Sequence, residues 1–144
     1  MMSKAAQKHL RLDLLVGQKL MGFRLKKKRM GNCKHPIGYR LETRDGQHVG
    51  MTVGFFGWGW HHNSDSAWFG CPRYSTEISA AWQVWSLMAE NNSLFQCFLE
   101  EACKLACRSR RTWSFQEGLR KMTPEIICKA ALQVKGISLR KLAV

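Results

Sequence analysis

Apolar positions recur with the period of an α-helix in three segments of the chain. These segments cover about residues 5–21, 75–90 and 123–136, and a polar or basic face accompanies the first of them. The hydroxyl of Ser75 or Thr76 predicts the N-cap of the second helix. Its apolar face, which we expect in the core, consists of Ile78, Ala81, Trp82, Trp85 and Met88.

Between the first two helices the pattern changes to short apolar or alternating runs, which are typical of β-strands. Two such runs cover residues 38–42 and 51–56. The dipeptide Asp45-Gly46 separates them and favours a tight hairpin turn. We therefore expect two antiparallel strands, and residues 112–115 predict a further short strand.

Residues 93–111 fit two structures, because their apolar positions match a helix at some residues and an alternating strand at others. Both interpretations stay open. Together the elements predict an α+β fold with an antiparallel or mixed sheet and about three helices. We expect a single domain over residues 1–144, with flexible ends at 1–4 and 138–144.

Composition supports a soluble globular domain, since 45% of the 144 residues are hydrophobic and 23% are charged. The longest apolar stretch, residues 51–60, is too short and too rich in glycine to span a bilayer, so we expect no membrane association. The net charge is +13, from 23 Lys and Arg against 10 Asp and Glu. A surface this positive predicts an anionic partner.

Six cysteines are present, and no secretory segment precedes them. Cys97, Cys103, Cys107 and Cys128 lie among apolar residues, which predicts small buried side chains in a reduced protein.

Cysteine and histidine ligands that zinc prefers are also present, at Cys33, His35, His61, His62 and Cys71. Their spacing is not that of a zinc knuckle, so we expect no metal and no cofactor. Nothing around Cys71 resembles the signature of a cysteine nucleophile, and no pair of carboxylates suggests acid–base catalysis. We therefore expect that the protein is not an enzyme.

A loop rich in aromatic and histidine residues leads into the second helix and suggests a ligand site. Indoles can stack on a base, an arginine can hold a phosphate, and a helix start favours an anion. The candidate ligand-binding residues here are Trp58, Trp60, His61, His62, Trp68, Arg73, Tyr74, Ser75 and Thr76. The alternative is that the aromatic side chains fill the core and that Ser75 or Thr76 only caps the helix.

A run of cations at residues 24–29 is a second candidate. Lys26, Lys27, Lys28 and Arg29 are its members that we assign to ligand binding. Such a run is also typical of a solvated loop or of an edge strand whose lysines discourage pairing with other chains.

Three stretches of the chain, residues 12–22, 74–82 and 123–132, resemble the phage ABA sandwich domain family. The middle stretch, from Tyr74 to Trp82, is the most specific of the three. The resemblance implies a small α/β/α sandwich, a bacteriophage or prophage origin and a place in the cytoplasm of the bacterial host.

These features favour a non-enzymatic binding protein that captures an anionic ligand. A nucleotide second messenger of host antiviral immunity is the sharpest hypothesis, with the protein acting as a counter-defence sponge. One alternative is a basic nucleic-acid-binding protein that uses residues 24–29 together with Arg108, Arg110 and Arg111. Another is an inhibitor of an acidic host defence enzyme. Six tryptophans exceed what one small core needs, so we also expect a homo-oligomer, most simply a dimer.

Overall fold

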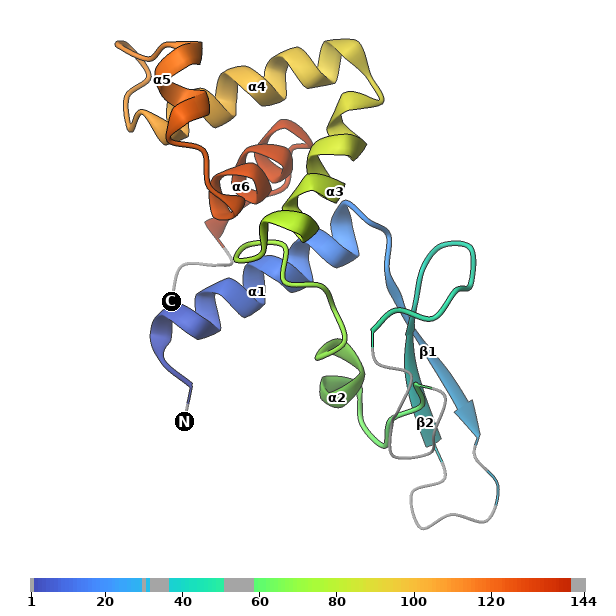
Figure 1. Ribbon diagram of the computed structural model, residues 1–144. Helices are drawn as coiled ribbons and strands as arrows, with labels where there is room; N and C mark the ends of the chain where they lie inside the picture. Colours follow the sequence, from blue (N-terminus) through green and yellow to red (C-terminus); the bar gives the residue numbers. More distant parts are fainter. Residues whose placement is uncertain (1, 30, 32–36, 51–58, 141–144) are drawn as a thin grey trace. The chain divides into compact units, whose positions relative to one another are not determined.

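The computed structural model describes residues 2–29, 31, 37–50 and 59–140 of the chain (Figure 1). The chain divides into two compact units. Met1–Val16 and Arg73–Val144 form one, which we call the helical unit, and Gly17–Pro72 forms the other, which we call the sheet unit. The single domain expected from the sequence stays a prediction.

Most of the helical unit consists of α-helices that pack on one another. They are α1 (Lys4–Lys19), whose last residues belong to the sheet unit, α3 (Ile78–Ala89), α4 (Asn92–Ala106), α5 (Phe115–Arg120) and α6 (Pro124–Val134). Helix α6 packs against α3 and α4, and α5 packs against α4. Fully buried side chains such as Met88, Phe98 and Leu132 form the core between them.

The predictions for the first and third helices are confirmed. The Thr123 hydroxyl accepts a hydrogen bond from the backbone N–H of Ile126 at 3.3 Å, and Pro124 is the first residue of α6. Gly136 follows the helix with a φ of 76°, in the left-handed region that glycine adopts without strain.

Most of the open segment 93–111 is helical, because helix α4 covers Asn92–Ala106. The side chain of Asn91 caps it by accepting a hydrogen bond from the N–H of Leu94 at 3.1 Å. The side of α4 that faces the core carries the buried residues Phe98, Ala102 and Cys103. Cys97 is exposed and Cys107 is half-buried, so their prediction as buried residues is wrong, while that for Cys103 and Cys128 is confirmed.

The strand predicted at residues 112–115 is wrong. Ser114 is the N-cap of helix α5, because its hydroxyl accepts a hydrogen bond from the N–H of Glu117 at 3.2 Å. A hydroxyl residue between two aromatic residues fits an alternating strand as well as a cap, and here the cap forms.

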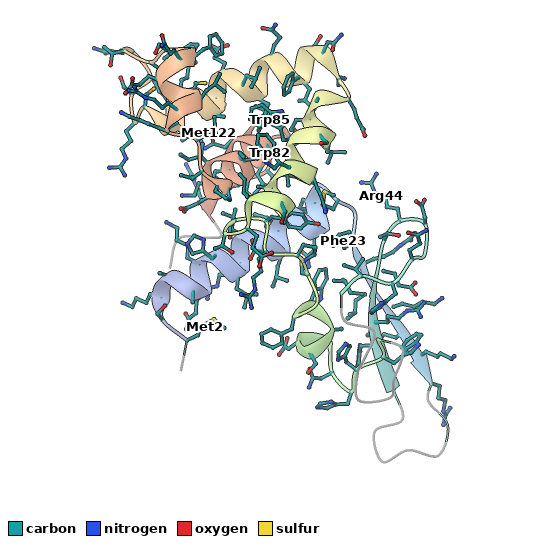
Figure 2. The ribbon with its side chains drawn as sticks, in the orientation of Figure 1. Met2, Phe23, Arg44, Trp82, Trp85 and Met122 are labelled. Carbon is teal, nitrogen blue, oxygen red and sulfur yellow. The ribbon has the colours of Figure 1, made fainter. Side chains whose placement is uncertain are left out.

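The apolar face predicted for the second helix, α3, is partly wrong. Ile78 and Trp82 are half-exposed, and the buried residues of α3 are Ala80, Ala81, Val84 and Met88. Small side chains let α3 approach α6 closely, since α6 also buries Ala130 and Ala131. The indoles therefore lie beside this contact, where Trp82 and Trp85 pack edge to face with ring centroids 5.2 Å apart (Figure 2).

The cap predicted for α3 is also wrong. Glu77 occupies the N-cap position and makes no side-chain capping hydrogen bond. Ser75 is buried instead, its backbone N–H donating to Asp13 Oδ1 at 2.7 Å. Its hydroxyl donates to the carbonyl oxygen of His9 at 3.3 Å and so ties α1 to the segment before α3.

The sheet unit is built on a two-stranded antiparallel sheet. Strand β1 (Arg24–Arg29) pairs with β2 (Ile37–Glu42), and helix α2 (Ser64–Trp68) packs against β2. Residues 48 and 61 form isolated bridges to β2 at Glu42 and Tyr39. The cationic run is therefore a strand, which is one of the two interpretations that the sequence allowed.

The turn predicted at Asp45-Gly46 is present. The N–H of Thr43 donates to the carbonyl oxygen of Gln47 at 2.8 Å, and Gly46 has a φ of 82°. The strand predicted at residues 51–56 lies outside the described residues.

The predicted α+β class with an antiparallel sheet is confirmed. The described residues form six helices, and not the three or so that periodicity indicated. Asn63, Asn91 and Ser114 cap the additional helices, two of which are too short to show an apolar period. The α/β/α layering stays a prediction.

A buried acid links α1 to the start of α3 and makes the stability of the helical unit depend on pH. Burial raises the pKa of Asp13, although hydrogen bonds from Ser75 and the nearby charges of His9 and Arg73 act in the opposite direction. A carboxyl whose pKa is raised on folding destabilises the fold as pH rises through that pKa.

We expect Asp13→Asn to be stabilising relative to the native protein at neutral pH, because an amide oxygen still accepts the Ser75 N–H and no charge is buried. The difference in free energy of unfolding should grow as pH rises from about 4 to 7. Asp13→Ala leaves that N–H without its acceptor and should cost about 1–3 kcal/mol. Urea unfolding followed by circular dichroism measures both, and an Asn variant as unstable as the Ala variant at every pH would contradict the account.

Candidate anion-binding site

The two strands of the sheet unit carry a large excess of positive charge. Strand β1 holds five cations in six residues, β2 adds Arg40, and the one acidic residue on either strand is Glu42. All residues of β1 except Leu25 are exposed. A strand with this pattern attracts anions and cannot serve as a core strand.

The antiparallel register sorts these side chains onto two faces, because neighbours along a strand alternate and cross-strand partners share a face. The first face carries Arg24, Lys26 and Lys28 from β1 and Glu42, Arg40 and Gly38 from β2. The second carries Leu25, Lys27 and Arg29 opposite Leu41, Tyr39 and Ile37. Leu41 is fully buried, so the apolar part of the second face supplies the hydrophobic anchor of the sheet.

Glu42 balances part of the charge on the first face. Its buried carboxylate accepts a hydrogen bond from Arg40 Nε at 2.8 Å and a second from Arg40 Nη2, both on Oε2. Lys26 Nζ lies 3.9 Å from the other oxygen. The sheet is thus pre-arranged around one carboxylate, and most of its cations remain unneutralised within the two strands.

Trp60 lies against the same cations. The Cζ atom of Arg40 is 4.8 Å and Lys28 Nζ is 5.5 Å from the centre of the indole ring, distances at which a cation and an aromatic ring attract each other. Gly38 lies opposite Lys28 and has no side chain, so the ammonium can reach across β2. Only 8% of Trp60 is exposed. The indole therefore holds the cations in place and offers little surface of its own.

A hollow of about 420 Å³ lies at the end of the sheet, and the described residues that line it are Lys27, Lys28, Arg29 and Ile37. Its volume is within the range typical of small-molecule sites. On the second face Lys27 Nζ lies 5.9 Å from the ring centre of Tyr39. Cations and apolar surface therefore line the same hollow, which suits a ligand with phosphates and a flat apolar part.

The two candidate histidines also belong to the sheet unit. His61 forms a pair of 2.8 Å backbone hydrogen bonds with Tyr39. Burial lowers the pKa of His61, and His48 and His62 lower it further, so the ring is neutral at pH 7. His62 is exposed and its Nε2 lies 3.0 Å from Asn63 Nδ2. At neutral pH His61 adds no charge to the site.

The remaining candidates are distributed over both units. Trp68 is half-buried at the end of α2, and Trp58 lies outside the described residues. Arg73 and Thr76 of the helical unit are exposed, whereas Tyr74 and Ser75 are buried. The Ser75 N–H and hydroxyl already bond to α1, so Ser75 offers neither to a phosphate.

Ser75, His9 and Asp13 lie close together, but not in the order of a hydrolase triad. His9 Nδ1 is 3.2 Å from the Ser75 hydroxyl, and Asp13 Oδ1 accepts a hydrogen bond from the Ser75 N–H at 2.7 Å. In a triad the histidine lies between serine and aspartate. Here Ser75 contacts both His9 and Asp13, so the cluster connects α1 to the segment before α3.

The cysteines and histidines of the described residues bear on metal binding and on thiol chemistry. No group of three or more His, Cys, Asp or Glu side chains there could hold a metal ion, and Cys33 and His35 lie outside those residues. Burial raises the pKa of the Cys103 and Cys128 thiols, which keeps them protonated.

A second cationic hollow occurs on α1. It has a volume of about 310 Å³, and Lys4, Lys8 and Arg11 are among its lining residues. These side chains come from one helix face, whereas the sheet hollow combines cations with neighbouring aromatic rings. Sequence reasoning identified the cations of β1 but missed Tyr39, Arg40 and Glu42, whose roles depend on strand register.

A comparison with protein families identifies a family for this chain. The family model described as the phage ABA sandwich domain matches residues 15–132 of this chain, which include both strands and all helices from α2 to α5. A search of curated proteins and a search of solved structures return no match. Within the described residues, no helix is both long and apolar enough to cross a membrane.

The contacts of Glu42 predict how its substitution changes the free energy of unfolding. Glu42→Gln removes the charge that Arg40 and Lys26 face, and the weaker hydrogen bonding should lower the free energy of unfolding by about 1–3 kcal/mol. Asp45→Asn is the matched control, because it removes the same charge from the same unit and an Asn-Gly pair suits the turn equally well. Equal stability of the two variants in urea unfolding would contradict the role of Glu42.

Proposed function

The chain belongs to the phage ABA sandwich domain family, and from this premise we propose that it is a non-enzymatic phage protein that captures a phosphate-bearing nucleotide on its cationic sheet. The observation that carries the proposal is the charge of the two strands. Six cations accompany one carboxylate there, and that carboxylate is buried and already paired. A phosphate group supplies the missing negative charge.

The surroundings of these cations favour a nucleotide among phosphate-bearing ligands. The hollow combines Lys27, Lys28 and Arg29 with the apolar side chain of Ile37. Phosphates can pair with the cations while a base and ribose contact apolar and aromatic surface. In a phage protein inside a bacterial host, such capture would withdraw a nucleotide second messenger from an antiviral pathway.

Calorimetry tests this proposal with a panel of cyclic dinucleotides, cyclic trinucleotides and cyclic ADP-ribose isomers. We expect at least one to bind with a dissociation constant below about 100 µM. The triple variant Lys27→Gln, Lys28→Gln, Arg29→Gln should bind it at least about tenfold more weakly, a loss of 1.4 kcal/mol.

The control variant Lys4→Gln, Lys8→Gln, Arg11→Gln removes the same charge from α1 and should bind as the native protein does. A loss of binding in this control with none in the β1 variant would place the ligand on α1 and contradict the proposal. Absence of binding to every nucleotide in the panel would contradict it as well.

A second candidate function is nucleic-acid binding, which the exposed run of cations along β1 favours. A two-stranded antiparallel ribbon fits the major groove of DNA, and lysines and arginines on it can contact phosphates. The arginines proposed to assist, Arg108, Arg110 and Arg111, lie in the helical unit, where Arg110 is paired with Glu101 at 2.9 Å.

Salt dependence tests this second function. The logarithm of the DNA association constant should fall linearly with the logarithm of salt concentration. The slope should become shallower by about 0.9 for each DNA phosphate that the β1 triple variant no longer neutralises. No retention of DNA in a gel shift at about 50 mM salt would exclude this function, because electrostatic binding is strong at such low salt.

Two further expectations stay predictions. Homo-oligomerisation would cover large apolar side chains that are about half-exposed in the helical unit, namely Ile78, Trp82, Phe115 and Leu119. A cytoplasmic location in the host follows from the proposed ligand.

A further inference from the structure

Arg40 is held more firmly than any other cation described on the sheet. Glu42 Oε2 accepts from its Nε and Nη2, and the centre of the Trp60 indole lies 4.8 Å from its Cζ. A guanidinium fixed on one edge and against one aromatic ring loses little further conformational freedom when a ligand arrives. This arrangement fixes where its remaining donors lie.

Three N–H bonds of Arg40 remain beyond those that Glu42 accepts, two on Nη1 and one on Nη2. They have no hydrogen-bond partner among the described residues. One N–H on each of these nitrogens forms the end-on edge of the guanidinium, a fork that donates two parallel hydrogen bonds. A ligand must therefore present two adjacent acceptors to use this edge fully.

Lys28 connects Arg40 with the hollow at the end of the sheet. Its ammonium lies over the same indole as Arg40, and Lys28 is one of the described residues that line the hollow. One nucleotide can therefore contact the hollow with its phosphates and Arg40 with its base.

Guanine is the base that fits the fork. Its O6 and N7 are adjacent acceptors, whereas adenine presents an amino group beside N7 and would turn a donor toward the guanidinium. We propose that Arg40 selects a guanine-type base and that Glu42 and Trp60 are positioning residues that fix its guanidinium. This inference rests on the proposed function, because it assigns the base of the nucleotide whose phosphates the sheet binds.

Calorimetry with four diphosphates and pyrophosphate tests the inference on the native protein. GDP and IDP share O6 and N7 and should bind within about twofold of each other, while ADP and 7-deaza-GDP should bind about tenfold more weakly, as expected for one bidentate contact. Pyrophosphate has no base and should bind at least as weakly as ADP.

Two variants separate recognition of the base from attraction between charges. Arg40→Lys keeps the charge but not the fork, so the ratio of GDP to ADP affinity should fall toward one while pyrophosphate affinity stays within about threefold. Glu42→Gln should lower the same ratio and leave pyrophosphate affinity unchanged or higher, since it removes a negative charge near the site. A purely structural role of Glu42 would weaken all ligands alike.

The outcomes distinguish the inference from the proposed function. Equal binding of GDP, ADP and pyrophosphate by the native protein would overturn the guanine assignment and leave phosphate capture standing. So would an Arg40→Lys variant that keeps the full preference for GDP. Absence of binding to all five probes would overturn the guanine assignment, and the proposed function would fall with it only if the cyclic nucleotide panel also failed to bind.

Discussion

Repulsion among like charges must be offset for the sheet unit to fold. Five cations of β1 and Arg40 of β2 occupy two short paired strands, and one carboxylate, Glu42, is available on those strands to oppose them. Two features offset this repulsion. Glu42 is buried between Lys26 and Arg40, where its charge is least screened by water, and the rings of Trp60 and Tyr39 attract neighbouring cations. The other charges face solvent.

The same features favour the proposed binding of an anion by the sheet. An ionic contact that must first order a long side chain gains little, whereas Arg40 and Lys28 are already positioned by the indole. The polar and acidic groups of the helical unit are arranged differently. Its buried Asp13 and Ser75 bond to each other, and Ser75 also bonds to His9. Its acids Glu117 and Glu125 pair with lysines one turn away. The helical unit also carries exposed cations, among them Lys4, Lys8 and Arg11, which line the hollow on α1.

Sequence patterns indicated the helices with clear caps, such as Thr123 before α6, because a cap and an apolar period act over a few residues. They could not decide the use of Ser75, since its partners His9 and Asp13 lie more than sixty residues away. Nor could they distinguish Ala80 from Trp82 as a buried residue, because packing on α6 decides it. At the site, the cations of β1 could be recognised from the sequence alone. The contact of Arg40 with Trp60 could not, because it depends on how the chain folds back on β2.

In the proposed function the sheet unit, and not the helical unit, receives the anion. Nitrogen–proton NMR spectra of the labelled protein during titration with GDP test it most directly, because every backbone amide and each indole N–H reports separately. We expect the largest shifts in β1, in β2 and at the indole of Trp60, with small changes in α3, α4 and α6. Largest shifts along α1 or at the start of α3, with the sheet unaffected, would contradict it.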